Sequence, residues 1–99
     1  MCGLFGHSKN GNQDLENSLR SLETLYHRGP DQSGKWENDL VFIGHRRLSI
    51  LDLTDNGRQP MVDRENTVVI SVNGEIYNFK DIRKELVNKY NFISKSDSE

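Results

Sequence analysis

The sequence predicts an α+β fold with mostly antiparallel strands, and three observations lead to this prediction. Apolar residues recur at helical spacing over residues 15–26, and a second helical pattern covers residues 79–90. Residues 40–43 form an unbroken apolar run, and residues 67–72 are rich in β-branched side chains. Both patterns are typical of strands. A chain of 99 residues is long enough for one small domain.

The N-terminal part of the chain predicts a strand followed by a helix. Residues 2–6 are small and apolar and predict the strand. The helix over residues 15–26 has Asn12 and Asp14 as alternative N-cap residues. Pro30 ends this helical segment, because proline disfavours the helical conformation in the residue before it. The helix has one apolar face, which we expect to pack on a sheet.

The next predicted strand runs into two consecutive arginines. Residues 40–43 are apolar throughout, as expected for a strand that is buried on both faces. Arg46 and Arg47 follow closely. Because successive strand residues point to opposite faces, one arginine is expected to face inward and the other outward. An inward arginine needs an anionic partner, because an unpaired buried charge is too costly.

The C-terminal part repeats the order of strand and helix. Residues 63–66 predict a turn, and residues 67–72 give the strongest strand prediction in the chain. Asn78 is positioned to cap the helix over residues 79–90. Residues 92–93 predict a further short strand.

The composition argues against several function classes. Basic and acidic residues are mixed, and the net charge is −2 at pH 7. The sequence therefore has no basic patch that would indicate nucleic-acid binding and no basic amphipathic helix that would indicate binding to a membrane surface. No apolar run is long enough to span a bilayer, and the N-terminus lacks the pattern of a secretory signal. One cysteine cannot form an internal disulfide, which favours a reducing, cytoplasmic setting.

Cys2 is the only cysteine and directly follows Met1. Removal of Met1 would leave a cysteine with a free α-amino group. The thiolate is the nucleophilic form of cysteine, and an α-amine with a pKa of about 7.7–8.0 can accept the thiol proton near neutral pH. An N-terminal amine that serves as base for its own nucleophile is known in covalent catalysis. The alternative is an inert cysteine that packs as a small apolar side chain.

Asn73-Gly74 supports two interpretations. Between two strands, this dipeptide is the usual signal for a tight hairpin turn. However, residues 75–78 do not alternate cleanly, and a helix is predicted almost at once. The second interpretation makes the Asn73 amide and the Gly74 backbone N–H hydrogen-bond donors that hold a developing oxyanion.

No metal or nucleotide site is predicted. Cys2, His7, His27 and His45 lack the spacing of a zinc site. His27 and His45 each precede an arginine, which lowers their value as neutral bases, so we expect them to be structural hydrogen-bonding groups. The glycines form neither a dinucleotide-binding nor a phosphate-binding loop.

Six stretches of the sequence, taken together, resemble one family. They are MCGLFG from Met1, HRGPDQSG from His27, GHRRLSILDL from Gly44, GRQPM from Gly57, VNGEIYN from Val72 and SDSE from Ser96. They resemble the glutamine amidotransferase domain of asparagine synthetases, a class II domain with an N-terminal nucleophile. The stretches follow the order and similar spacing of that family. The glucosamine-phosphate synthases, which use the same chemistry, resemble this chain less.

The resemblance implies a set of catalytic roles. Cys2, after loss of Met1, would attack the side-chain amide of glutamine, with its own α-amino group as base. Asn73 and Gly74 would form the oxyanion hole. A γ-glutamyl thioester on Cys2 would form and then be hydrolysed to glutamate.

The resemblance also implies a set of substrate-binding roles. Arg47 would pair with the α-carboxylate of glutamine, which answers what an inward arginine could bind. Ile50 and Leu51 would line the glutamine pocket, partly through their backbone. Glu75 and Asp97 would hold the α-ammonium group. A zwitterionic amino acid needs one cation and at least one anion, and these residues supply both.

By resemblance, residues 1–99 are the N-terminal portion of an Ntn-hydrolase αββα sandwich, a truncated type-2 glutamine amidotransferase domain. In the intact protein, ammonia would pass to an ATP-activated aspartate, with ATP and magnesium expected only in a missing synthetase domain. No cofactor or metal is expected in residues 1–99. The expected partners are glutamine and that synthetase domain, with a homodimer as one assembly. The alternative is a non-catalytic remnant that serves as a binding or interaction module.

Overall fold

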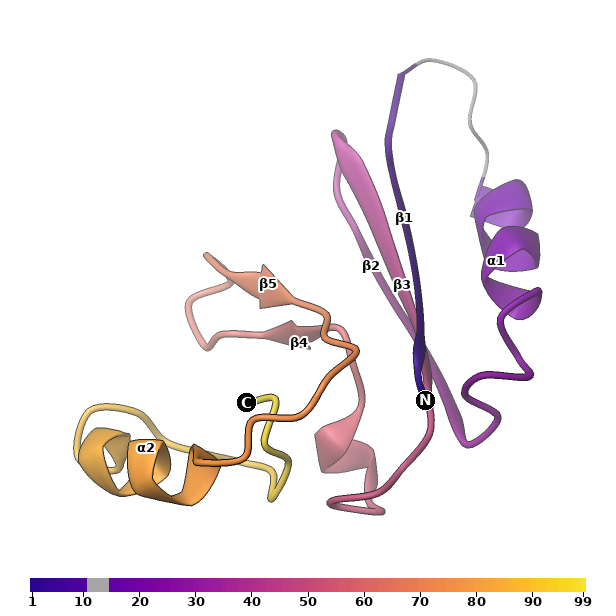
Figure 1. Ribbon diagram of the computed structural model, residues 1–99. Coiled ribbons are helices and arrows are strands. Elements are labelled where there is room, and N and C mark those ends of the chain that lie inside the picture. Colours follow the sequence, from indigo (N-terminus) through magenta and orange to yellow (C-terminus); the bar gives the residue numbers. More distant parts are fainter. Residues whose placement is uncertain (11–14) are drawn as a thin grey trace.

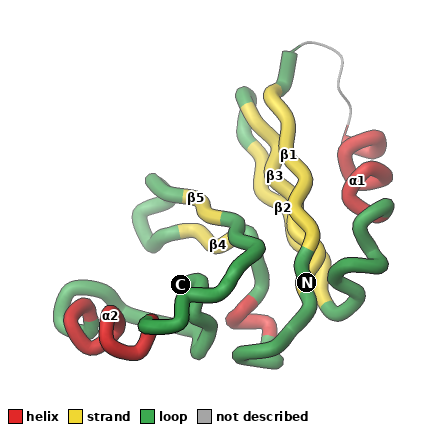
Figure 2. Tube along the Cα trace, viewed as in Figure 1, coloured by secondary structure: helices red, strands yellow, loops and turns green. Residues whose placement is uncertain are grey.

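The computed structural model describes residues 1–10 and 15–99 and has an α+β fold with antiparallel sheets, as predicted (Figures 1 and 2). The elements are β1 (Gly3–Ser8), α1 (Leu15–Glu23), β2 (Gln32–Glu37), β3 (Val41–Arg47), a 3-10 turn (Asp55–Gly57), β4 (Met61–Val62), β5 (Val69–Ile70) and α2 (Phe79–Leu86). The larger sheet has the order β1-β3-β2, and β4 pairs with β5 in a second, two-stranded sheet. Neither described helix is long and apolar enough to cross a membrane.

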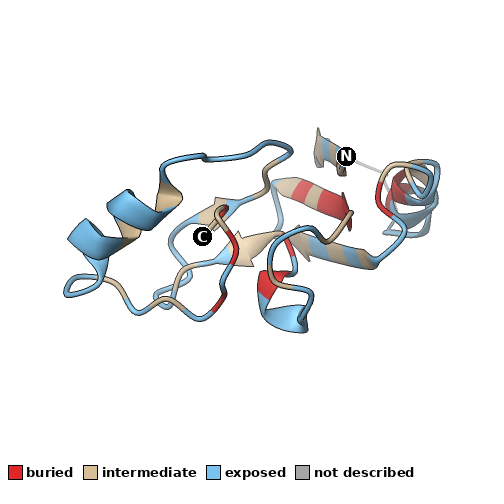
Figure 3. Ribbon diagram, turned by 60° about the horizontal axis from the view of Figure 1, so that its bottom comes forward, coloured by how far each residue is buried: buried red, intermediate tan, exposed pale blue. Residues whose placement is uncertain are grey.

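The core lies between α1 and the central strand β3. Phe42 of β3 and Leu22 of α1 are almost fully buried, with 0% and 1% of their surfaces exposed. Gly44 lets the helix approach, because a Cβ atom there would lie 2.9 Å from Leu22 Cδ2. Figure 1 shows α1 beside the larger sheet, and Figure 3 shows buried residues on β3 and on the facing turn of α1. This packing fixes the position of β3, the strand that contains His45 and Arg47.

The C-terminal segment after α2 is folded back by side chains. Arg83 donates hydrogen bonds of 2.7 Å to the carbonyl oxygens of Ser94 and Ser96, and its guanidinium lies 4.3 Å from the centre of the Phe92 ring. The Glu99 carboxylate accepts hydrogen bonds from the backbone N–H groups of Ile93 and Ser94. These contacts bring the end of the chain back towards the larger sheet (Figure 1).

The N-terminal predictions are confirmed in kind and differ in their limits. The strand predicted over residues 2–6 is β1, which continues to Ser8. The helix ends at Glu23 rather than at residue 26, and hydrogen-bonded turns continue the chain to residue 29. The candidate caps Asn12 and Asp14 lie outside the described residues.

The prediction of one inward and one outward arginine is wrong for Arg46. Arg46 and Arg47 do lie at successive positions of β3, but 6% and 4% of their surfaces are exposed, so both are buried. Arg46 lies on the α1 side, where it pairs with Glu23 at 3.1 Å and stacks 4.8 Å from the Tyr26 ring centre. Its Nε donates to the Gly29 carbonyl at 3.0 Å. Alternation does place the two arginines on opposite faces of β3. The face that carries Arg46 is covered by α1 and the turn after it, and is therefore not exposed to solvent.

The strand predicted over residues 67–72 is much shorter than expected. Only Val69–Ile70 pairs, with β4. On one side, the Asp63 carboxylate accepts hydrogen bonds from the N–H groups of Thr67 and Val68. On the other side, the Val72 N–H donates to the Gln59 side chain. Side chains bind backbone groups that a longer strand would use for pairing.

The last two elements also depart from the predictions. The helix predicted over residues 79–90 is α2, which ends at Leu86. Asn78 occupies its N-cap position but makes no capping hydrogen bond with its side chain. The strand predicted over residues 92–93 is wrong, because that segment is irregular and the Ile93 N–H is bound by the Glu99 carboxylate.

Candidate active site

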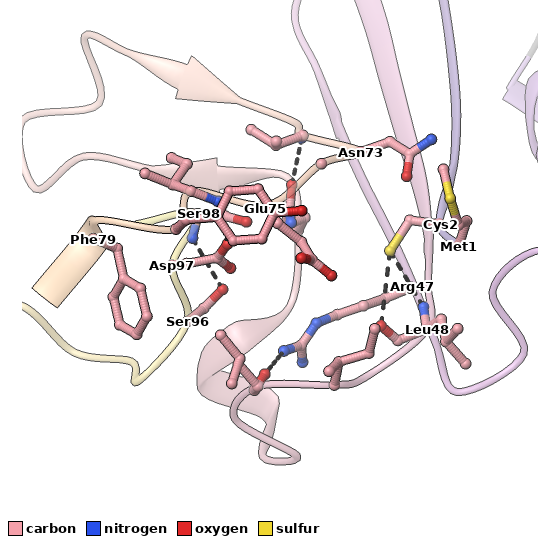
Figure 4. Close-up of a pocket in the computed structure, with 17 residues that line it drawn as sticks. Met1, Cys2, Arg47, Leu48, Asn73, Glu75, Phe79, Ser96, Asp97 and Ser98 are labelled. Carbon is pink, nitrogen blue, oxygen red and sulfur yellow. Dashed lines mark hydrogen bonds between the residues drawn. The ribbon is translucent and has the colours of Figure 1, made fainter.

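The structure brings all eight predicted site residues to one cavity of about 460 Å³ (Figure 4). Four segments form its wall: the N-terminus, the loop after β3, the loop after β5 and the C-terminal segment. The predicted residues that line it are Cys2, Arg47, Ile50, Leu51, Asn73, Gly74, Glu75 and Asp97. No strand or helix holds most of these residues, so loop-anchoring contacts decide the geometry.

Cys2 lies immediately before β1 and is half-buried. The Leu48 N–H donates a hydrogen bond to the Cys2 Sγ at 3.4 Å, and the Leu48 carbonyl lies 3.8 Å from the same sulfur. Arg28 Nε donates to the Cys2 carbonyl at 3.0 Å. The register of β1 on β3 places Gly3 opposite Arg46. Strand pairing and the Arg28 contact together fix the backbone of the cysteine at the edge of the cavity.

Arg47 reaches the cavity from the end of β3. Its Nη1 donates to Gln32 Oε1 at 2.8 Å, and its Nη2 donates to the carbonyl oxygens of Leu51 and Asp52 at 2.5 and 2.7 Å. Among residues 1–10 and 15–99, no carboxylate lies within ion-pair distance of Arg47. Neutral oxygens therefore orient the guanidinium, while its charge interacts only weakly with the Asp52 carboxylate.

Gly57 makes room for this guanidinium. A Cβ atom on Gly57 would lie 2.3 Å from Nη2 and 2.6 Å from Cζ of Arg47. Any larger residue would therefore push the guanidinium away from its carbonyl acceptors. The glycine belongs to the GRQPM stretch, and the close contact gives a physical reason for a glycine there.

Gly57→Ala is therefore expected to displace the Arg47 guanidinium. If Arg47 binds the substrate carboxylate, as the resemblance implies, kcat/KM for glutamine should fall about 10- to 100-fold, because a misplacement of about 1 Å can cost about 100-fold in rate. Asn56→Ala is the matched control, since Asn56 lies in the same 3-10 turn with its surface exposed. Equal kinetic effects of the two substitutions would contradict this role of Gly57.

Asn73 and Gly74 do not form a hairpin turn. No strand follows them in the described chain, and α2 begins at Phe79 after irregular backbone with a bend at Gly74. Both residues are exposed and line the cavity. The preceding residue is held on both sides: the Val72 N–H donates to Gln59 Oε1 at 2.6 Å, and its carbonyl lies 3.0 Å from His45 Nε2.

The two acidic site residues lie on the opposite side of the cavity from Cys2 (Figure 4). Asp97 Oδ2 accepts a hydrogen bond from the Ile76 N–H at 2.7 Å, so this carboxylate also anchors the loop that contains Glu75. Ile50 and Leu51 complete the wall, with 66% and 41% of their surfaces exposed. The cavity thus has carboxylates at one side, a sulfur at the other and a guanidinium between them.

The sequence analysis did not predict that Asp52 helps to shape the site. Its carboxylate accepts hydrogen bonds from Thr54 and from the Lys95 N–H, the latter at 2.7 Å. The Thr54 hydroxyl first, and then the backbone N–H groups of Lys95 and Thr54, lower the pKa of Asp52 to about 2. The carboxylate therefore ties the Arg47 loop to the segment that carries Asp97. The only sequence signal was its place within the GHRRLSILDL stretch.

The histidines hydrogen-bond to backbone or side chains. His27 Nδ1 lies 3.0 Å from the Thr24 carbonyl, and His45 contacts the Val72 carbonyl, as expected for structural groups. His7 Nε2 lies 2.7 Å from Ser18 Oγ. Within the part of the chain that the structure describes, no three His, Cys, Asp or Glu side chains are placed to hold a metal ion.

An antiparallel α+β chain with a cysteine beside its N-terminus, an arginine and two carboxylates around one cavity has the features of an amidotransferase domain. Residues 1–99 match the profile of a family described as the glutamine amidotransferase domain. The chain therefore belongs to that family.

Several curated proteins are similar over the whole chain. The chain is 39% identical over 102 residues to asparagine synthetase B (glutamine-hydrolysing) of Escherichia coli K12, and 40% identical over 105 residues to asparagine synthetase 1 of Bacillus subtilis 168. It is 38% identical over 113 residues to amidase chry2 of Gibberella zeae. All of the chain is aligned, but it covers only 18%, 16% and 17% of these relatives, respectively. The predicted resemblance to the amidotransferase domain of asparagine synthetases is confirmed.

Proposed function

We propose that this chain is the glutaminase part of an asparagine synthetase-like amidotransferase. It would hydrolyse glutamine to glutamate and ammonia through a thioester on Cys2. The observation that supports this proposal most strongly is that one cavity is lined by Cys2, by Asn73 and Gly74, and by the arginine and carboxylates proposed to bind a zwitterionic substrate. The similarity to glutamine-hydrolysing asparagine synthetases supports the same substrate.

The proposed reaction begins at the N-terminus. After Met1 is removed, the α-amine of Cys2 takes the thiol proton, and the thiolate attacks the δ-carbon of glutamine to form a C–S bond. The oxyanion accepts hydrogen bonds from the Asn73 side-chain amide and the Gly74 N–H. The C–N bond then breaks, and the α-ammonium group returns a proton to the leaving ammonia. Water hydrolyses the thioester, releases glutamate and restores the thiol.

The rest of the cavity holds the amino-acid end of the substrate. Arg47 pairs with the α-carboxylate through its charge and its Nε–H, because Nη1 and Nη2 already donate to protein oxygens. Glu75 and Asp97 hold the α-ammonium group, and Ile50 and Leu51 line the apolar wall. Each of these side chains lines the same cavity as Cys2, which supports their assignment to one bound molecule.

The further steps belong to a longer protein. Since the relatives named above include glutamine-hydrolysing asparagine synthetases, we propose aspartate, activated by ATP, as the acceptor of the ammonia. ATP and magnesium would bind in a synthetase domain outside residues 1–99, and the cytoplasm is the proposed compartment. A binding module without catalysis is the rival function, and it predicts glutamine binding with no release of glutamate.

The proposed function is tested by the state of the N-terminus. Met1 is exposed, with 69% of its surface accessible, and it lines the cavity beside Cys2. A full-length protein made with a cleavable extension before Cys2 is expected to be inactive, because the amine is blocked. Cleavage that frees the Cys2 amine is expected to start glutamate release from glutamine. Mass spectrometry reports the N-terminal state in each sample.

The same preparation before cleavage is the control, so folding and concentration are matched. Glutamine hydrolysis by the uncleaved protein would contradict the amine as base. Glutamine binding without glutamate release after cleavage would support the binding module instead.

A further inference from the structure

We propose that His45 and Gln59 are positioning residues that clamp Val72 from both sides and thereby set the place of the oxyanion donors Asn73 and Gly74. The inference rests on the proposed function, because it assigns these donors a role in glutamine hydrolysis. The two clamp residues come from different stretches of the chain. Both are polar, and 0% and 4% of their respective surfaces are exposed.

The clamp uses both backbone polar groups of Val72. The Val72 N–H donates to Gln59 Oε1 at 2.6 Å, and the Val72 carbonyl accepts from His45 Nε2 at 3.0 Å. Val72 lies beyond the end of β5 at Ile70, in irregular backbone. Two side chains therefore perform the anchoring that a neighbouring strand performs in a regular sheet.

The clamp residues contact the same three-stranded sheet that positions Cys2 and Arg47. His45 lies in β3, opposite Leu4 of β1 and Gly34 of β2. The backbone of Gln59 presses on the same sheet, because a Cβ atom on Gly34 would lie 2.0 Å from the Gln59 carbonyl oxygen. Cys2 precedes β1, and Arg47 ends β3. The clamp therefore fixes the position of the loop with Asn73 and Gly74 relative to Cys2 and Arg47.

The hydrogen bonding of His45 is consistent with a neutral imidazole that donates from Nε2. Burial lowers the pKa of His45 below the ordinary value of 6.5, the Val72 carbonyl opposes this shift, and the charge of Arg47 adds to it. The Nδ1 atom is buried and has no hydrogen-bond partner in the described part of the chain. A neutral ring with hydrogen on Nε2 leaves no N–H unsatisfied there, whereas a protonated ring would bury an unpaired donor.

The experiment uses paired substitutions in the full-length protein. His45→Leu removes the donor to the Val72 carbonyl, whereas His45→Gln keeps an amide donor near the position of Nε2. Gln59→Met removes the acceptor at similar size. Thr67→Val is the control, because it removes a hydrogen bond to Asp63 at the other end of the β5 segment.

The kinetic readout separates positioning from general loosening. Because oxyanion donors act mainly in the transition state, His45→Leu and Gln59→Met are expected to lower kcat for glutamine by about 10- to 100-fold. We expect KM to stay within about threefold, since Arg47 is not altered. His45→Gln is expected to recover most of kcat, and Thr67→Val to resemble the unaltered protein. A rise in KM at unchanged kcat would overturn the proposal.

Hydrogen exchange tests the clamp without reference to activity. The Val72 amide, which donates to Gln59 Oε1, is expected to exchange about 10-fold faster in His45→Leu and Gln59→Met, and at the original rate in His45→Gln and Thr67→Val. Unchanged exchange in both clamp variants, or equal acceleration throughout β3, would overturn the clamp. If the unaltered protein does not hydrolyse glutamine, the proposed function fails, and the exchange rates still decide whether the clamp exists.

Discussion

Replacing Cys2 by alanine is expected to abolish glutamine hydrolysis and to leave the fold intact. Cys2 is the only cysteine of the chain and its sulfur lies in the cavity wall. Removal of a nucleophile typically lowers the rate by on the order of 10⁴-fold or more. The loss of stability should be small, because the half-buried sulfur contacts the Leu48 backbone only through long, weak hydrogen bonds. Glutamate release from glutamine and thermal unfolding are the two measurements.

Two controls accompany this prediction. Cys2→Ser is expected to be nearly as inactive as Cys2→Ala, because a hydroxyl is far harder to deprotonate than a thiol. In the full-length protein, synthesis with ammonia in place of glutamine is expected to continue in both variants. Substantial glutamine hydrolysis by purified Cys2→Ala would contradict the assignment of the nucleophile.

The sequence predicted the elements that depend on local periodicity. The apolar face of α1 and the apolar start of β3 each indicate that the segment packs against another element. Both elements are present in the structure. The limits of the later elements were not predictable in the same way. The ends of β5 are set by Asp63 and Gln59, which bind backbone groups from outside the strand. No pattern within residues 67–72 indicates these distant partners.

The residues that line the candidate site were predicted from the sequence, but the hydrogen bonds that hold its loops in place were not. The resemblance named eight residues, and all eight line one cavity. His45 was expected to be a structural hydrogen-bonding group, but its partner was not predicted, and Asp52 and Gln59 were given no role. These three residues act through hydrogen bonds to backbone groups up to 43 positions away. Each is polar and lies in a quoted stretch, yet its role depends on which loop comes to lie above it.

Arg46 illustrates why alternation alone misleads. Alternation predicted that one of the two arginines faces outward, and the carboxylate-binding role implied for Arg47 left Arg46 as that residue. In the structure it pairs with Glu23 and is as buried as Arg47. Arg46→Ala would remove a buried side chain that also donates to the Gly29 carbonyl and stacks on Tyr26, so loss of activity in this variant would report on folding. A suitable control must instead be an arginine that is exposed near the same loop.

Arg47→Ala is expected to weaken the use of glutamine strongly. Loss of one partner of a buried, hydrogen-bonded charge pair costs about 2–5 kcal/mol, which is on the order of 30- to several-thousand-fold in affinity. Arg47→Lys should restore only part of this, since lysine lacks the planar fork. Arg58→Ala is the control: Arg58 flanks the same 3-10 turn, its side chain is 52% exposed, and its ion pair with Asp55 is a surface contact. It is expected to change kcat/KM by less than about threefold.

The structure adds a complication, because Arg47 also holds the loop through the carbonyl oxygens of Leu51 and Asp52. A second substrate separates the two roles. Glutaminamide carries a neutral amide in place of the α-carboxylate, so it lacks the group that Arg47 is proposed to bind. If Arg47 binds the carboxylate, the unaltered protein should prefer glutamine strongly, and Arg47→Ala should lose most of that preference, because the two changes remove the same interaction. If Arg47→Ala instead lowers kcat/KM equally for both substrates, Arg47 only supports the loop, and another group must bind the carboxylate.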